Sequence, residues 1–123
     1  MLKVHAKNLE TVTILCLQGQ IVNGETEILR NTVSSLFQRS AVILDLARVT
    51  TIDAHGLGVM LDLREQAQAK GIRFELVNLT KQVSRVFKLT RLDSVFLISS
   101  KLELFPSVSR DARATVAALR SYA

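Results

Sequence analysis

The sequence predicts an α/β fold, a single domain over residues 1–123 with a small, mostly parallel or mixed sheet. Short segments in which apolar and polar residues alternate indicate strands, and longer segments with apolar residues three or four positions apart indicate helices. These segments follow one another in the order β-β-α-β-α-β-α-β-α, which requires helical crossovers between parallel strands. A composition with 48% hydrophobic residues and one Pro is typical of a packed globular chain.

The first three elements are predicted to be a hairpin followed by a helix. Residues 2–7 alternate apolar and polar side chains, as in an edge strand, and residues 11–20 carry apolar side chains on both faces, as in an inner strand. The "NLE" segment between them predicts the hairpin turn. Over residues 24–39 apolar side chains recur on one helical face, with Asn23 and Gly24 as the expected caps.

The remaining elements continue the alternation of strands and helices. The segment "AVILDLARV" is the clearest strand, and the glycine after Lys70 favours the end of a helix. Thr80 is the expected N-cap of the third helix, and Pro106 suits the first turn of a last helix that runs to the C-terminus. Residues 99–106 are compatible with strand or helix. The other predicted elements are strands over residues 41–49, 72–78 and 94–98 and helices over residues 57–70 and 80–91.

Charge and composition argue against several classes of protein. The chain has 16 Lys and Arg against 11 Asp and Glu, but the cations are spread out and form no basic tail. The five Phe and one Tyr lie mostly in apolar patterns and provide no stacking surface, so direct nucleic-acid binding is not expected. No apolar run reaches the roughly 18 residues of a membrane span, and the N-terminus lacks the apolar region of a signal peptide. We expect a cytoplasmic protein without membrane insertion.

Few residues could carry chemistry. The single Cys has no CxxC partner, and His5 and His55 lie far apart in the sequence, so neither a metal site nor a cofactor is predicted. The "GLG" segment does not satisfy a dinucleotide fingerprint. Asp53 is only two residues from His55, which is poor geometry for a catalytic triad, and the motif contains no serine. We therefore do not expect an enzyme; a hydrolase activity abolished by His55→Ala would be needed to support one.

Three groups of polar residues each allow two interpretations. Asp53 either accepts backbone N–H groups at the start of the second helix or belongs to a surface that a partner contacts, and His55 is either a solvated first-turn residue or a specific contact. The basic residues of the third helix form either a solvated face or a site for an acidic partner or anionic ligand. These residues are Lys81, Arg85, Lys88 and Arg91. The hydroxyl residues Thr50, Thr51, Ser84, Ser99 and Ser100 are typical of turns and caps, with regulatory phosphorylation as the alternative.

The segment "VILDLARVTTIDAHGLGVML" resembles the signature of STAS domains, the sulfate-transporter and anti-sigma-factor-antagonist family. The family pattern is a strand with "LDL", a short loop, then Asp, Ser or Thr, another small residue, and Gly and Leu opening a helix. The likeness extends over residues 2–98 and includes "LQGQIVNGE" and "LVNLTKQVSRVFKLTRLDSVF". It implies a small mixed sheet with helices packed mainly on one face, in agreement with the predicted elements.

The resemblance also implies a function. Stand-alone members of the family are bacterial anti-sigma factor antagonists, which bind a serine-kinase anti-sigma factor and thereby free the sigma factor. Phosphorylation of the Ser or Thr after the Asp breaks that complex, because it adds charge and bulk at a packed interface. In this chain Asp53 matches the acid, Gly56 the glycine and Leu57 the apolar helix residue. Ala54 stands at the phosphoacceptor position and His55 follows it, so the usual acceptor hydroxyl is missing.

We therefore expect an anti-sigma factor antagonist-like signalling adaptor that binds a serine-kinase anti-sigma factor of the GHKL type and is not phosphorylated at the family position, Ala54. The expected partner-binding residues are Asp53, Ala54, His55, Gly56, Leu57, Gly58 and Val59. The alternative is a diverged STAS module that serves as a scaffold, a sensor of a small ligand or nucleotide, or a subunit of a lipid-transport system. Phosphorylation of Thr50 or Thr51 instead, and formation of a homo-oligomer, are left open.

Overall fold

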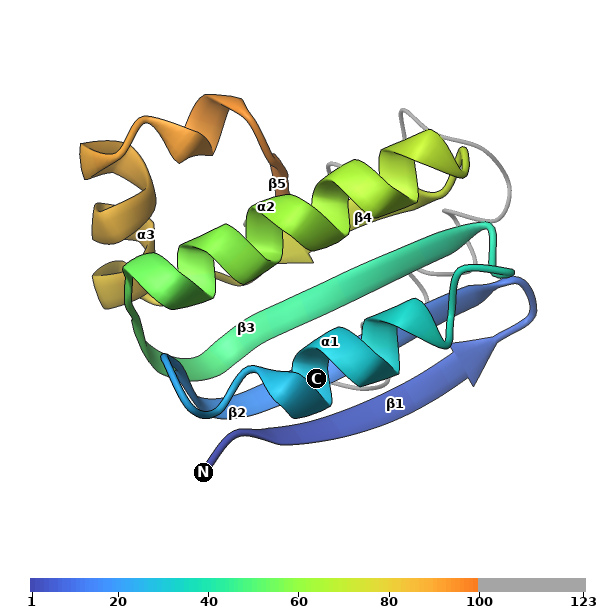
Figure 1. The fold of residues 1–123 in the computed structure, drawn as a ribbon, viewed down its shortest axis with the longest axis horizontal. Coiled ribbons are helices and arrows are strands. Elements are labelled where there is room, and N and C mark those ends of the chain that lie inside the picture. The colour runs from blue at the N-terminus through green and yellow to red at the C-terminus, as the bar shows by residue number, and fades with distance from the viewer. Residues whose placement is uncertain (100–123) are drawn as a thin grey trace.

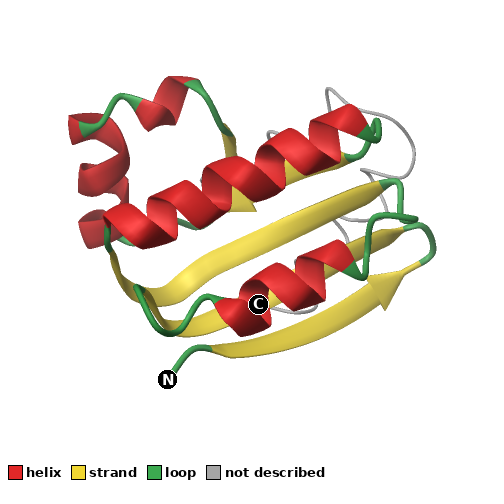
Figure 2. Cartoon of the chain, viewed as in Figure 1, coloured by secondary structure: helices red, strands yellow, loops and turns green. Residues whose placement is uncertain are grey.

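Five strands and three helices are found in residues 1–99, the part of the chain that the computed structural model describes (Figures 1 and 2). The strands are β1 (Lys3–Leu9), β2 (Val12–Ile21), β3 (Ala41–Ile52), β4 (Arg73–Val77) and β5 (Leu97–Ser99). The helices are α1 (Glu27–Ser34), α2 (Ala54–Ala69) and α3 (Lys81–Leu89), and a 3₁₀ helix, η1, spans Leu92–Ser94. The last helix expected from Pro106, Ser100 and most of the ambiguous segment 99–106 lie outside the described residues.

The strands form one mixed sheet in the order β1-β2-β3-β4-β5. β1 and β2 are antiparallel, whereas β2, β3, β4 and β5 run parallel to one another. Each parallel pair is joined by a helical crossover, with α1 before β3, α2 before β4, and α3 with η1 before β5. The α/β fold with a mixed sheet that the alternation predicted is confirmed.

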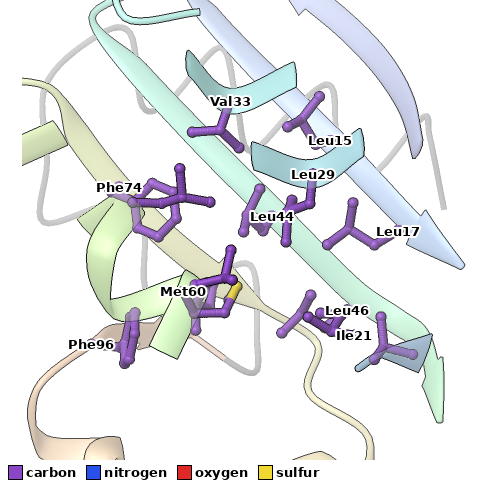
Figure 3. Close-up of a cluster of buried hydrophobic side chains, with 14 of the residues drawn as sticks. Leu15, Leu17, Ile21, Leu29, Val33, Leu44, Leu46, Met60, Phe74 and Phe96 are labelled. Atoms are coloured by element: carbon purple, nitrogen blue, oxygen red, sulfur yellow. The ribbon is translucent and has the colours of Figure 1, made fainter. Parts of the chain in front are cut away.

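The core lies between the two helices α1 and α2 and the face of the sheet that they cover (Figure 1). Leu44 at the centre of β3 pairs with Leu15 on β2 and with Leu76 on β4, so three leucines form a row across the sheet. All three are fully buried, as are Leu29 of α1 and Met60 of α2, which pack in the same cluster (Figure 3). Burying an aliphatic side chain of this size stabilises the fold by about 1.5–3 kcal/mol.

α3 and η1 close one end of this core. Val83 and Phe87 are the buried residues of α3, and Phe96 after η1 meets the Phe87 ring edge-on, with centroids 5.4 Å apart and planes at 67°. Such an edge-to-face contact adds to the stabilisation that burial alone provides. The fold of residues 1–99 contains no helix long and apolar enough to cross a lipid bilayer.

The central strands are buried on both faces, which explains their nearly continuous apolar sequences. The residues buried on the face opposite α1 and α2 include Ile14, Ile43, Val77, Asp45 and Glu75. Asp45 accepts hydrogen bonds from the Ala47 N–H at 3.0 Å and from Asn78 Nδ2 at 3.4 Å, and Glu75 pairs with Arg73. Both buried carboxylates are therefore partnered, as burial of a charge requires.

Several element boundaries differ from those predicted. The hairpin turn lies at Glu10 and Thr11, so only the last residue of the predicted "NLE" turn belongs to it, because β1 continues through Leu9, which pairs with Val12. Glu10 takes the left-handed conformation, with a φ of 51°, that lets two residues reverse the chain. The predicted strand over residues 94–98 is wrong at its start, because η1 occupies Leu92–Ser94 and β5 begins only at Leu97.

The third correction concerns α1, which is shorter than the predicted 24–39. Its N-cap is Thr26, not Asn23 or Gly24, because the Glu25 N–H bonds to the Val22 carbonyl at 3.0 Å and closes a turn first. Gly24 has a φ of 91° in this turn. α1 ends at Ser34, and successive turns carry the chain on to β3.

Candidate functional site

The candidate site lies where β3 passes into α2, and we call residues 53–59 the α2 tip. The predicted strand 41–49 extends to Ile52, so Thr50 and Thr51 belong to β3 and are exposed on it. The predicted start of the helix at residue 57 is corrected to Ala54, because Asp53 already caps the first turn. The ends of β2 and β3 and the starts of α1 and α2 meet at one edge of the sheet (Figure 1).

Asp53 holds three segments together at this edge. Its Oδ1 accepts a hydrogen bond from the Gly56 N–H at 2.8 Å, as an N-cap residue does, and its Oδ2 accepts one from the Asn23 N–H at 3.0 Å. Its own N–H donates to the Ile21 carbonyl at 3.3 Å. Asp53 therefore fixes the start of α2 to the end of β2 through its backbone and to the loop that leads into α1 through its side chain.

The same hydrogen bonds stabilise the charged form of Asp53. The Asn23 N–H, and after it the Gly56 N–H, lower the pKa of this carboxyl below its ordinary value of 3.8. Burial acts in the opposite direction, and the charge of nearby His55 lowers the pKa further. Asp53 is therefore an anchored carboxylate whose two oxygens are both engaged, which suits a structural anchor better than a proton donor or acceptor.

The close contact between α2 and β2 requires a glycine at position 56. A Cβ at this position would lie 1.9 Å from the Ile21 carbonyl oxygen and 2.9 Å from the carbonyl carbon, so no side chain fits between α2 and β2. Two residues on, Gly58 is exposed and a Cβ there would meet nothing within 4 Å. The two glycines of the α2 tip thus differ: Gly56 belongs to the framework and Gly58 leaves an open surface.

The predicted partner-binding residues divide between surface and core. Gly56, Leu57 and Val59 are buried, with Leu57 7% and Val59 2% exposed, and Asp53 is half-buried. The exposed members are Ala54, His55 and Gly58. Only these three residues are accessible enough for a partner to contact them directly, and the other four residues fix their positions.

His55 is tied to α1 by a contact that the sequence did not indicate. Its Nε2 lies 3.2 Å from the hydroxyl oxygen of Thr26, the N-cap residue of α1. Thr26 makes no side-chain capping bond to its own helix, so its hydroxyl is committed to His55. Thr26 is only 7% exposed, so the contact lies at a mostly buried point between the starts of α1 and α2. Threonine is a residue type that often caps helices, so Thr26 itself was a signal for the start of α1. Because the prediction placed the caps at Asn23 and Gly24, it did not use that signal.

The other polar residues singled out in the sequence lie outside the α2 tip. Thr50 donates to the Gly19 carbonyl at 3.3 Å, Ser84 is half-buried on α3, and Ser99 is buried. Lys81, Arg85 and Lys88 are exposed on α3, whereas Arg91 lies beyond the helix end, with a φ of 61°. Within residues 1–99, His, Cys, Asp and Glu side chains form no cluster of a kind that could hold a metal ion.

Comparison with known proteins identifies both a family and a fold. The family model described as the STAS domain matches residues 3–110 of the chain. An anti-sigma factor antagonist from Mycobacterium paratuberculosis superposes with a TM-score of 0.73 at 20% identity, covering 94% of each chain. A candidate anti-sigma factor antagonist from Thermotoga maritima gives 0.74 at 24% identity, over 87% of this chain and 95% of that one. SpoIIAA of Bacillus in its unphosphorylated form gives 0.69 at 19%, over 83% and 92%.

Proposed function

The chain belongs to the STAS domain family, and on that basis we propose that it is an anti-sigma factor antagonist-like signalling adaptor. Its partner is a serine-kinase anti-sigma factor of the GHKL type, bound through the exposed residues of the α2 tip. Because Ala54 replaces the family's phosphoacceptor, the chain stays in the form that binds its partner. Similar proteins named anti-sigma factor antagonists, one of them known in both phosphorylated and unphosphorylated forms, support this role.

The observation that carries the proposal is a small exposed surface on a rigid support. Ala54, His55 and Gly58 are exposed, while Asp53 and Gly56 fix the helix start against the end of β2. A surface held in this way loses little conformational entropy on binding, which favours affinity. Ala54 has only a methyl group and Gly58 has no side chain, so the partner can approach the helix backbone closely at these two positions.

The missing hydroxyl determines how binding can be regulated. A phosphate at position 54 would place about two negative charges at the start of α2, where the helix dipole stabilises them within the chain itself. The same charge and bulk would disrupt a packed protein interface. Ala54 carries only a methyl group, so regulation falls to the abundance of the chain or to another signal.

The test is recovery of the kinase from an extract of the source cells by tagged wild type, Ala54→Asp and Ala54→Asn. Aspartate and asparagine have nearly the same size, so their difference isolates charge. We expect wild type and Ala54→Asn to retain a GHKL-type kinase, identified by mass spectrometry, and Ala54→Asp to lose it. A kinase retained equally by Ala54→Asp would contradict binding through the α2 tip. A co-purifying small molecule without a kinase would favour the diverged module, whether scaffold, ligand sensor or lipid-transport subunit.

A second variant tests the absent switch. With the recovered kinase and ATP, Ala54→Ser should gain the mass of one phosphoryl group and release the kinase, because it restores the hydroxyl at the exposed first position of α2. Wild type should gain none. A phosphoryl group on Thr50 or Thr51 of the wild type would show that a hydroxyl of β3 serves as the acceptor, and the chain would then be switchable after all.

A further inference from the structure

α3 presents a face of three cations to solvent, and we call Lys81, Arg85 and Lys88 the α3 basic face. Their spacing of four and three residues places them on one side of the helix. All three are exposed, whereas Val83 and Phe87 are buried in the core. The structural role of α3 is therefore carried by its apolar side, and the fold does not require the cations.

The charges of the α3 basic face are not neutralised within the described part of the chain. α3 contains no Asp or Glu, and none of the ion pairs formed among residues 1–99 includes Lys81, Arg85 or Lys88. Like charges at this spacing repel one another and destabilise the helix slightly. A ligand or partner with negative charge would relieve that repulsion.

A surface hollow lies against the same face. It has a volume of about 470 Å³ and is lined by Leu79, Lys81, Ser84, Arg85, Lys88 and Leu89. Leu89 is 79% exposed and adds apolar surface to the hollow. Basic groups along an open hollow bounded by two leucines match a chain segment that carries both carboxylates and apolar side chains.

We propose that the α3 basic face docks an acidic, leucine-containing segment of a protein partner. Its carboxylates pair with Lys81, Arg85 and Lys88, and an apolar side chain covers Leu89. Charge complementarity selects the partner class, because every charged group that lines the hollow is positive. A bilayer is a poorer fit, since Leu89 is the one large apolar side chain that α3 exposes, and Val83 and Phe87 are buried in the core. A nucleic acid is also a poorer fit, since no aromatic side chain lines the hollow for base stacking.

This surface is made of different residues from the α2 tip, so the proposal does not depend on the proposed function. The test uses the full chain and a fluorescein-labelled peptide of repeated Glu-Glu-Leu units, with a Gln-Gln-Leu peptide as the uncharged counterpart. Affinity is measured by fluorescence anisotropy at low and at physiological ionic strength. Amide shifts of the ¹⁵N-labelled chain map the contact, and no kinase is involved.

We expect the Glu-Glu-Leu peptide to bind, the Gln-Gln-Leu peptide to fail, and shift changes to concentrate on residues 79–89. The variant Lys81→Gln/Arg85→Gln/Lys88→Gln should weaken binding by about tenfold or more, since it removes all three positive charges that pair with the carboxylates of the peptide. Leu89→Ser should weaken it by about fivefold through lost apolar burial. The control Lys3→Gln/Arg64→Gln/Lys70→Gln removes the same charge elsewhere on the surface and should keep most of the affinity.

Three results would overturn the proposal. The first is equal loss of affinity in the α3 variant and in the control, which would indicate attraction by net charge alone. The second is shift changes away from α3 in the wild type, a result that does not depend on how any variant folds. The third is stronger binding to phosphatidylglycerol vesicles or to single-stranded DNA than to the peptide, which would assign the face to a different class of partner.

Discussion

At the scale of single residues, the α2 tip separates positions that hold the fold from positions that face solvent. Gly56 and Gly58 show the difference most clearly, because they lie two residues apart on one helix and neither has a positive φ. A side chain at Gly56 would overlap the Ile21 carbonyl, and a side chain at Gly58 would extend into open space.

The two glycines should therefore respond in opposite ways to the same substitution. Gly56→Ala should lower the free energy of unfolding by about 3 kcal/mol, because α2 must move away from β2 to admit the Cβ. Gly58→Ala should raise it by about 0.5–1 kcal/mol, since alanine is the better helix former. Urea unfolding followed by circular dichroism measures both. Equal effects of the two substitutions would contradict the contact between Gly56 and β2.

Asp53 should make stability depend on pH in the acid range. Its pKa is lowered in the folded chain, so its stabilising effect is present above the ordinary value of 3.8 and is lost as the pH falls through the lower, folded value. At neutral pH, Asp53→Asn should melt at a lower temperature than wild type, and the gap should narrow as the pH falls below 3.8. Thermal melts over a pH series test this, with the exposed Asp93→Asn as the control. A gap that stays constant with pH would show that charge is not the cause.

The residue types of the site were predictable, but their division between surface and core was not. The sequence indicated Asp53 as a possible cap, and the structure shows it capping α2. It did not indicate that Thr26 contacts His55, because that contact joins residues 29 positions apart. Nor did local pattern reveal that Gly56 touches Ile21, since such an approach depends on how β2 and α2 are placed in three dimensions.

At the scale of elements, Arg30 Nη1 on α1 and Asp62 Oδ2 on α2 are 2.6 Å apart, and their side chains are 43% and 45% exposed. Asp62 also accepts a hydrogen bond from Gln66 Nε2 at 3.0 Å. Because water reaches both partners, packing of Leu29 and Met60 in the core must contribute more to helix placement than this pair does.

A double-mutant cycle with Arg30→Met and Asp62→Asn should therefore give a coupling energy below about 1 kcal/mol. The coupling should shrink further at high salt, because exposed charges are screened. Unfolding in urea at two ionic strengths provides the measurement. A coupling above roughly 2 kcal/mol would mean that the pair is far better shielded from water than its exposure indicates.

The sequence located most of these elements and misplaced several of their ends. Strand and helix periods are properties of the segments themselves, so β2, β3, β4, α2 and α3 were all predicted near their observed positions. Ends depend on single backbone conformations: left-handed Glu10 moves the hairpin turn, and the turn at Gly24 delays α1. Because Asp53 caps α2, this helix starts at Ala54, three residues nearer the N-terminus than the predicted residue 57.

At the scale of the whole molecule, residues 1–99 depend on the leucine row that crosses the three central strands. Leu44 lies at its centre, pairs on both sides and is fully buried beneath the helices (Figure 3). Loss of packing there affects the sheet and the helices above it together. The chain should therefore unfold as one cooperative unit, as small domains usually do.

Leu44→Ala should lower the free energy of unfolding by about 3–4 kcal/mol, the cost of an unfilled cavity in a packed core. Ile28→Ala is the matched control, because Ile28 on α1 is 46% exposed and its truncation should cost less than about 1 kcal/mol. Denaturation followed by both circular dichroism and amide NMR intensities tests the size of the effect and the cooperativity. Separate transitions for the sheet and the helices would contradict a single shared core.

The separation of roles within the α2 tip has a consequence for how such a chain evolves. Substitutions at Ala54 and Gly58 alter the exposed surface, while Asp53 and Gly56 preserve the architecture beneath. On the proposed function, a duplicated gene can thus acquire new binding specificity through few point changes without first gaining spare stability, because exposed replacements away from structural contacts usually lower stability by no more than about 0.5 kcal/mol. Signalling pathways that use many copies of one small fold can in this way become insulated from one another.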